Sequence, residues 1–280
     1  MNEFNEIIYE KRDKIARISI NRPEKLNAAT PITIYEITQA FIDAWTDRQI
    51  GVVVFTGVGD KAFCVGGDQS IRVKGGYKES NKDMYNSEKY NGTIADLPLE
   101  VGWQFVTYLI RHIPKPVIAR VNGYAIGGGH VWQVNCDLSI ASEKAEFGQA
   151  GPRVGSYDPG YGTGELAKNV GMKRAKEIWF LCRRYNAKEA LEMGLVNTVV
   201  KHEKLDEEVD RWCDELLSKS PTSLKMLKYA FLAEAEGLVG ITEEGIGGLS
   251  LYYNTDEALE GRNAFMDKRK PDFWKFYSKP

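Results

Sequence analysis

"KPVIARVNGYAIGGGH", residues 115–130, passes from an apolar, β-branched run into three consecutive glycines. The run at 115–126 predicts a strand, and the "IGGGHVWQ" at 126–133 predicts a helix that begins directly after it. The first N–H groups of a helix have no partner within the helix, and the helix dipole favours negative charge there. The stretch lacks the GxGxxG spacing of a dinucleotide site, so we expect a turn that holds some other anionic or developing charge.

The neighbouring segments continue the alternation of strand and helix. "KIARISINRP" at 14–23 predicts a strand stopped by Pro23, and a helix is expected over 30–45. "GVVVFTG" at 51–57 is typical of a buried parallel strand, and "CDLSIAS" at 136–142 predicts another. The pattern predicts an α/β fold with right-handed crossovers.

The remaining length divides into a polar segment and a helical one. Residues 70–97 are polar, contain glycine and lack periodicity, which predicts a long mobile loop. Residues 173–280 carry helical patterns, one of them introduced by "SPTS" as an N-cap with an early proline.

Composition limits the classes of function. The chain has 280 residues, 43% of them apolar, and a net charge of −2, so no broad basic field would attract nucleic acid. No signal peptide or membrane span is expected, and four scattered cysteines without CxxC spacing indicate reduced thiols in a cytoplasmic protein. With three scattered histidines, the sequence predicts no metal site.

A second glycine turn, "CVGGDQ" at 64–69, follows the strand at 51–57. Together with the N–H groups at the start of the glycine-opened helix, it could hold a developing oxyanion. The alternative is that these glycines only permit close packing or positive φ.

Four ordered motifs carry a family resemblance over nearly the whole chain: "INRPEKLNA" at 20–28, "AFCVGGDQ" at 62–69, "KPVIARVNGYAIGGGH" at 115–130 and "AEFGQAGPRVGS" at 145–156. They resemble the crotonase superfamily of acyl-CoA enzymes. The resemblance implies a ββα superhelix core over residues 1–200 and a C-terminal helical region over 201–280 that assembles homotrimers or hexamers. It also implies that the N–H groups of Gly67 and Gly128 polarise a thioester carbonyl.

The hydratases of this family place two glutamates where this chain has Val131 and Gly151. A valine and a glycine cannot transfer protons, so simple hydration is disfavoured.

"GQAGPRVGSYDPGYGTG" at 148–164 and the C-terminal segments resemble one branch, that of 1,4-dihydroxy-2-naphthoyl-CoA synthase and 2-ketocyclohexanecarboxyl-CoA hydrolase. This resemblance implies that Asp158 is a proton shuttle and that Ser156 donates a hydrogen bond to a ring ketone. Tyr253 matches a C-terminal tyrosine that, in the family, enters from a neighbouring subunit. The alternatives are an Asx-turn at Asp158 and an interface role for Tyr253.

The same resemblance implies further contacts. Bicarbonate is the one small ion it suggests, at Gln149, Gly151 and Trp179, although Trp179 could equally be a core residue. Lys25 and Leu26 match the segment along the CoA moiety, and the basic residues around Lys268 would meet phosphates or form a solvated turn.

The direction of the reaction depends on "GGDQSIRVKGGY" at 66–77. Arg72 and Tyr77 match substrate-binding positions, but Ser70 stands where the synthase has a lysine for a second carboxylate. We therefore favour hydrolytic ring opening of a cyclic β-keto acyl-CoA, such as 2-ketocyclohexanecarboxyl-CoA or a bicyclic relative, in the degradation of aromatic or alicyclic compounds. The alternatives are ring closure by a naphthoyl-CoA synthase and a non-catalytic crotonase-like binding subunit.

Overall fold

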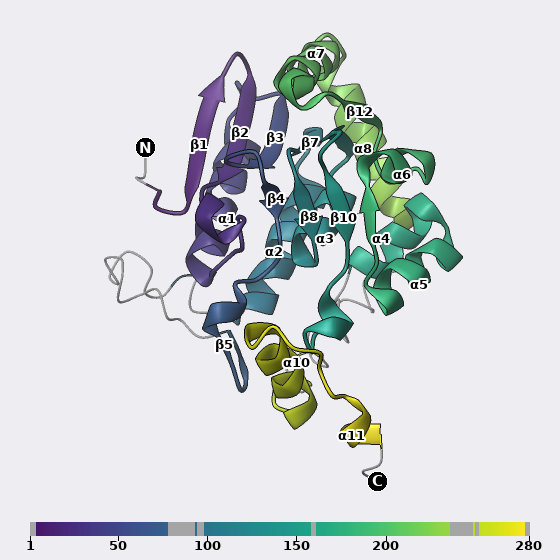
Figure 1. Cartoon of the computed structure of the whole chain (residues 1–280). Coiled ribbons are helices and arrows are strands. Elements are labelled where there is room, and N and C mark those ends of the chain that lie inside the picture. Colours follow the sequence, from purple (N-terminus) through teal and green to yellow (C-terminus); the bar gives the residue numbers. More distant parts are fainter. Residues whose placement is uncertain are drawn as a thin grey trace.

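A computed structural model of the chain describes residues 4–77, 93, 98–157, 161–235, 249 and 252–277. Two sheets form its centre, with helices packed around them (Figure 1). Of the segment expected to be a mobile loop, residues 78–92 and 94–97 lie outside the described ranges. Its first residues form a short antiparallel hairpin of β5 (Arg72–Val73) and β6 (Gly76–Tyr77).

The larger sheet has six strands in the order β1-β2-β3-β7-β9-β12. The pairing of β1 with β2 is antiparallel, and every later pairing is parallel. All residues of β3 are buried, as the continuous apolar run predicts. The strands are β1 (Ile7–Arg12), β2 (Ile15–Ile20), β3 (Val52–Gly57), β7 (Val117–Val121), β9 (Leu138–Ser142) and β12 (Thr198–Val200).

A smaller sheet corrects the expectation of one strand over 115–126. The chain leaves β7 at Val121 and enters β8 (Tyr124–Ile126) in the four-stranded sheet β11-β10-β8-β4. Asn122 is fully buried between them and donates to the carbonyls of Gly57 and Ala62. A side chain at Gly123 would overlap the Lys61 backbone, so only glycine permits this crossing. The other strands are β4 (Ala62–Cys64), β10 (Glu146–Gly148) and β11 (Arg184–Asn186).

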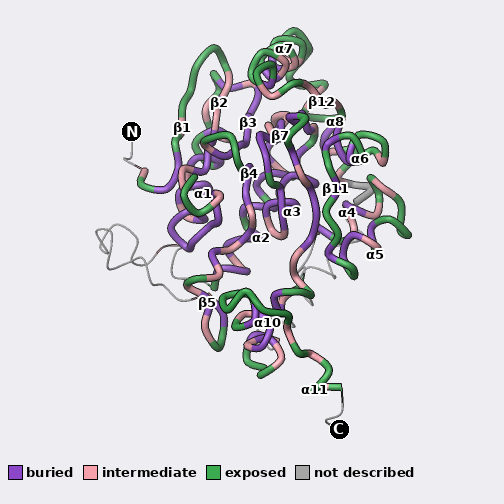
Figure 2. Tube along the Cα trace, viewed as in Figure 1, coloured by how far each residue is buried: buried purple, intermediate pink, exposed green. Residues whose placement is uncertain are grey.

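Three helices beside the sheets carry the main core. α1 (Pro31–Thr46) begins after Thr30, whose hydroxyl accepts from the Thr33 N–H in a capping box, close to the expected start. α2 (Leu99–His112) and α3 (Gly128–Asn135) follow, and the rings of Trp103 and Trp132 stack between them at 3.8 Å. Figure 2 shows the buried residues concentrated in these helices and the central strands. In the described ranges, no helix has the length and apolarity needed to cross a membrane.

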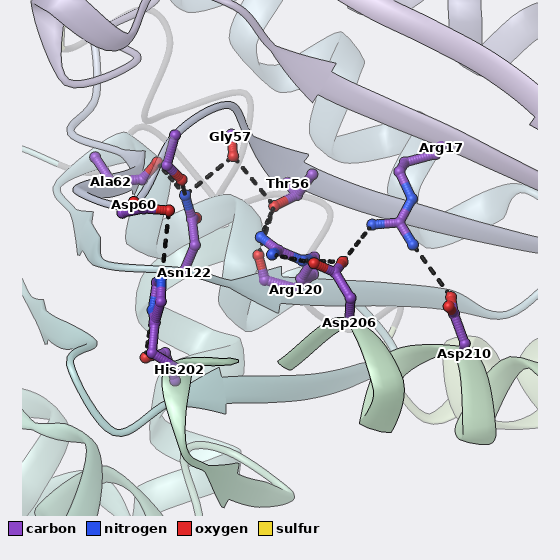
Figure 3. Close-up of polar contacts among 12 residues, drawn as sticks. Arg17, Thr56, Gly57, Asp60, Ala62, Arg120, Asn122, His202, Asp206 and Asp210 are labelled. Carbon is purple, nitrogen blue, oxygen red and sulfur yellow. Dashed lines mark hydrogen bonds and ion pairs between the residues drawn. The ribbon is translucent and has the colours of Figure 1, made fainter. Parts of the chain in front are cut away.

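The second half of the chain adds further helices. α7 (Leu205–Leu217) covers the outer face of the six-stranded sheet, where its Leu205, Val209 and Cys213 pack in one cluster with strand residues. Arg120 and Arg17 both donate to Asp206 at the start of α7 and fasten it to the sheet (Figure 3). The helices are α4 (Tyr161–Val170), α5 (Met172–Leu181), α6 (Ala187–Glu192), α7 (Leu205–Leu217), α8 (Pro221–Ala235), α10 (Asp256–Met266) and α11 (Trp274–Tyr277), with 3-10 turns at Pro23–Lys25, Gln69–Ile71, Gly151–Arg153 and His202–Lys204. The division at residue 200 stays a prediction.

Candidate active site

The two glycine turns meet. The first follows β4 through Gly66 at φ +93°, and the second enters α3 through Gly127 at φ +56°. A methyl group on Gly66 would lie 3.2 Å from the amide nitrogen of Gly128. Gly128 is the first residue of α3, so its N–H has no partner within the helix. The turns from strand ends far apart in the sequence therefore form one backbone surface.

This surface separates two hollows. An inner cavity of about 90 Å³ and an outer groove of about 540 Å³ are both lined by Gly67 and Gly128. Tyr77, Gly151 and Ser156 also line both. A ligand that fills both hollows would pass directly over the two glycines.

Helix α2 explains why these positions must be glycine. A methyl group on Gly67 would lie 2.9 Å from Leu99 Cδ2 and 2.8 Å from the Tyr77 hydroxyl oxygen. At Gly128 it would overlap the ring of Trp103. The N-terminal turn of α2 thus packs on both glycines, which leaves no room for a side chain at either one.

Side-chain hydroxyl groups form a second, polar wall of the inner cavity. The hydroxyl oxygens of Ser156 and Tyr253 lie 3.0 Å apart, and the Tyr77 hydroxyl accepts from Gln69 Nε2 at 2.6 Å. The two tyrosine rings meet edge to face with their centroids 6.0 Å apart. Burial raises the pKa of both phenols, so both are neutral hydrogen-bond donors at pH 7.

The Tyr253 hydroxyl lies 3.0 Å from the Ser156 hydroxyl of the same chain, and entry of this tyrosine into a neighbouring subunit stays a prediction. The segment that carries it folds back onto the β5–β6 hairpin, where the Gly75 N–H donates to the Tyr253 carbonyl at 3.2 Å. Figure 1 shows the hairpin beside α10 at the lower edge of the molecule. Tyr253, in the turn before α10, therefore lines the inner cavity of its own chain.

Arg72 holds this wall in place. Its guanidinium is buried and donates to the Val154 carbonyl at 2.7 Å, to the Gly155 carbonyl and to Gln69 Oε1 at 3.2 Å. It also lies 4.4 Å from the centroid of the Tyr253 ring. Within the described chain Arg72 lines neither hollow, so its contact with substrate stays a prediction.

The structure gives no view of Asp158, because residues 158–160 lie outside the described ranges. Ser156, which precedes it by two residues, lines both hollows. The proton-shuttle role of Asp158 stays a prediction.

The three residues expected to bind bicarbonate all line the inner cavity. Trp179 Nε1 is buried and has no hydrogen-bond partner among the described residues, whereas Gln149 Nε2 lies 2.9 Å from His130 Nδ1. Burial lowers the pKa of His130 to about 3, so its imidazole is neutral and can accept from Gln149.

Gly151 has no room for a side chain. A methyl group there would lie 2.9 Å from the Ser156 carbonyl oxygen. Backbone atoms of Ser156 and Tyr157 occupy the space that a side chain at position 151 would need, so the glutamate of the hydratases would not fit there.

Two side chains that line the hollows are not among the residues predicted from the sequence. Glu100, in the first turn of α2, is buried and lines the inner cavity. Arg184 of β11 lines the outer groove. The amphipathic run at 99–112 is the available signal for Glu100, but the run follows directly on a polar segment without periodicity, which obscures the start of the helix.

The outer groove contains both residues expected along the CoA moiety. Lys25 and Leu26 line it, and Leu26 ends its 3-10 turn with a left-handed backbone at φ +52°. Phe265 and Met266 of α10 line it from the other side. Lys268 is exposed two residues beyond them, and its phosphate contact stays a prediction.

Comparison with known proteins agrees with this geometry. The family described as enoyl-CoA hydratase/isomerase matches residues 10–275. A solved enoyl-CoA hydratase from Mycobacterium avium subsp. paratuberculosis K-10 is 27% identical, with a TM-score of 0.82 over 97% of this chain and 99% of that one. A methylmalonyl-CoA decarboxylase in complex with 2-nitronate-propionyl-CoA is 25% identical, with a TM-score of 0.79 over 97% and 99%.

A carnitinyl-CoA hydratase from Mycobacterium avium is also similar, at 27% identity and a TM-score of 0.76 over 95% of this chain and 97% of that one. The family match spans most of the chain, including both glycine turns and the C-terminal helix that carries Phe265. The chain therefore belongs to the enoyl-CoA hydratase/isomerase family, within the crotonase superfamily of acyl-CoA enzymes.

Proposed function

We propose that the protein hydrolyses a C–C bond in the ring of a cyclic β-keto acyl-CoA. The observation that carries the proposal is the inner cavity, which the Ser156–Tyr253 hydroxyl pair lines together with the two glycines. Val131 and Gly151 occupy the positions of the hydratase glutamates, so the cavity offers hydroxyl donors where a hydratase has carboxylates. Neutral donors suit a ring ketone.

The two hollows fit the two parts of such a substrate. The CoA moiety would lie in the outer groove along Lys25 and Leu26, and the ring would enter the inner cavity. The thioester carbonyl would then lie at Gly67 and Gly128, whose N–H groups stabilise the enolate oxygen. A single donor of this kind typically contributes about 10²–10³-fold in rate.

In the proposed reaction, water adds to the ring carbonyl carbon while Ser156 and Tyr253 donate to its oxygen. The ring bond from this carbon to the thioester α-carbon breaks, and its electron pair forms the thioester enolate. Asp158 takes a proton from the water, and the α-carbon receives a proton. The sum is the addition of one water and a new carboxylic acid.

Ring opening is favoured over ring closure by the absence of a second cationic anchor in the described part of the site. Ser70 donates to Asp68 Oδ1 at 2.6 Å, and Arg72 is engaged by backbone carbonyls. Lys74 is exposed. A decarboxylase, which by its name breaks a C–C bond, is among the similar structures and supports bond cleavage on this fold.

Mass spectrometry after incubation with 2-ketocyclohexanecarboxyl-CoA tests the proposal. Gain of one water is the expected result. An unchanged substrate, together with loss of one water from 2-succinylbenzoyl-CoA, would establish ring closure instead. A protein that binds CoA esters and converts neither, nor a bicyclic β-keto thioester, would support the non-catalytic alternative.

Of the residues predicted to bind bicarbonate, Gln149 already has its Nε2 2.9 Å from His130 Nδ1. The Trp179 N–H remains as the donor that would hold the ion, and we assign no step to it. Turnover measured with and without bicarbonate, in the wild type and in Trp179→Phe, tests this contact.

We also infer a homotrimer or hexamer in the cytoplasm. Large apolar side chains such as Phe180 and Phe231 are exposed in the single chain, and all four cysteines are free and buried. Analytical ultracentrifugation would distinguish trimer from hexamer.

A further inference from the structure

The first turn of α2 places a carboxylate beside the two glycine turns. Leu99 contacts the position of a Gly67 side chain, and Trp103 contacts that of Gly128. Glu100 lies between these residues in the same helix, three positions before Trp103, and residues at this spacing share one helix face. All three side chains line the inner cavity.

The surroundings of Glu100 are those of the reacting end of the cavity. Its side chain is buried, with 5% of the residue exposed, and the cavity it lines is shared with Tyr77 and Tyr253. A methyl group on Gly76 would lie 3.9 Å from Glu100 Oε2 and 3.6 Å from the Tyr253 ring. The negative charge of Glu100 also contributes to the raised pKa of Tyr253.

A carboxylate in this place matches a need of the reaction. An enolate whose oxygen lies at Gly67 and Gly128 has its α-carbon one bond from the thioester carbonyl carbon. Because α2 packs directly on both glycines, its first turn lies next to that carbon. Val131 and Gly151 cannot transfer a proton to it.

We propose that Glu100 is the acid–base group for the α-carbon of the bound acyl-CoA. As a carboxylate it takes the α-proton, and the electrons of the C–H bond pass into the enolate. In the reverse step its O–H bond breaks and the proton returns to the α-carbon.

The role of Glu100 in ring opening rests on the function proposed above. In that reaction, Glu100 gives the enolate its proton after the C–C bond breaks. Asp158 releases the proton of the attacking water to solvent, and Glu100 regains one from solvent. One water is added in total.

Exchange of the α-proton of cyclohexanecarboxyl-CoA in D₂O tests this role without ring opening, because this ester has an α-hydrogen but no ring ketone. The wild type is expected to exchange the proton, and Glu100→Gln to exchange it at least about 100-fold more slowly. Isothermal titration calorimetry should show that Glu100→Gln binds the ester with a Kd within about threefold of the wild-type value, as expected for a residue that transfers a proton.

Two further variants complete the test. Glu100→Asp keeps the acid group and should exchange faster than Glu100→Gln, which a purely structural role would not require. Glu143→Gln, at an exposed position, should exchange at close to the wild-type rate. Exchange by Glu100→Gln at the wild-type rate, or no exchange by the wild type, overturns the inference.

Product analysis with 2-ketocyclohexanecarboxyl-CoA separates this inference from the proposed function. Exchange without ring opening would overturn the function and leave Glu100 as the acid–base group. Ring opening at an unchanged rate in Glu100→Gln would overturn the role of Glu100 and support the proposed function.

Discussion

The two walls of the inner cavity are built in opposite ways. The glycine wall is backbone, and each of its turns is a short continuous piece at the end of a strand, near Gly67 and Gly128. The polar wall is made of side chains from distant segments, with Tyr77, Ser156 and Tyr253 meeting in one place. We expect the backbone wall to suit any acyl-CoA thioester and the polar wall to decide which reaction follows.

The largest effect on turnover is expected from Gly128→Ala, which adds a methyl group to the glycine wall. The added methyl group overlaps the ring of Trp103 and should displace the N–H that we propose to bind the thioester oxygen. Turnover of 2-ketocyclohexanecarboxyl-CoA should fall at least about 100-fold, the typical cost of one lost donor. The double variant Gly128→Ala with Trp103→Leu should regain part of it, and a fully active single variant would show that this wall is not rigid.

Arg72→Met removes a side chain that supports the polar wall. It removes the donors to the Val154 and Gly155 carbonyls in a buried place, which should lower the free energy of unfolding by about 2–4 kcal/mol. Urea denaturation measures this loss, with Arg48→Met at an exposed position as the control. A stability equal to that of the control would mean that Arg72 does not hold the wall.

Tyr253→Phe keeps the ring and removes only the hydroxyl that faces Ser156. Turnover should fall about 10–100-fold with little change in stability, because the loss is one hydrogen-bond donor in the site. Tyr252→Phe, whose hydroxyl faces Glu257 instead, is the matched control.

Mixing Tyr253→Phe subunits with Ser156→Ala subunits sharpens the same point. No recovery of turnover is expected, since both groups belong to one chain in the structure. Recovery would show that the tyrosine reaches a neighbouring subunit in the assembled protein.

The contrast between the walls also explains what the sequence can predict. The turns at 64–69 and 126–130 are local patterns at strand ends, so the amino-acid sequence alone predicts them. The helix at 99–112 follows a long polar segment, and the burial of Glu100 depends on packing against glycines far away in the sequence. The split between β7 and β8 depends likewise on Asn122 binding carbonyls of a distant turn. Such contacts have no signature within the segment itself.

The smallest expected effect concerns His130, which supports the glycine wall from within α3. Burial lowers its pKa from 6.5 to about 3, so the folded protein binds fewer protons at this site than the unfolded chain does. Stability from the neutral imidazole is therefore present at high pH and is lost as the pH falls below about 6.5. Between pH 7.5 and 5.5 the free energy of unfolding should fall by about 1 kcal/mol through this group.

His130→Gln removes this titrating group. The free energy of unfolding of the variant should therefore fall less between pH 7.5 and 5.5 than that of the wild type, by the amount given above, whatever the stability of the variant at either pH. Urea denaturation at pH 7.5 and 5.5 measures the difference, with His112→Gln on α2 as a second histidine variant for comparison. An equal pH dependence in the wild type and His130→Gln would mean that His130 keeps its ordinary pKa of about 6.5 in the folded protein and is protonated at pH 5.5. A protonated Nδ1 could no longer accept from Gln149 Nε2, and the amide would have to turn its oxygen toward the ring. The pH dependence therefore also determines which end of Gln149 faces the cavity, and with it whether an anion or a neutral group is favoured beside Trp179.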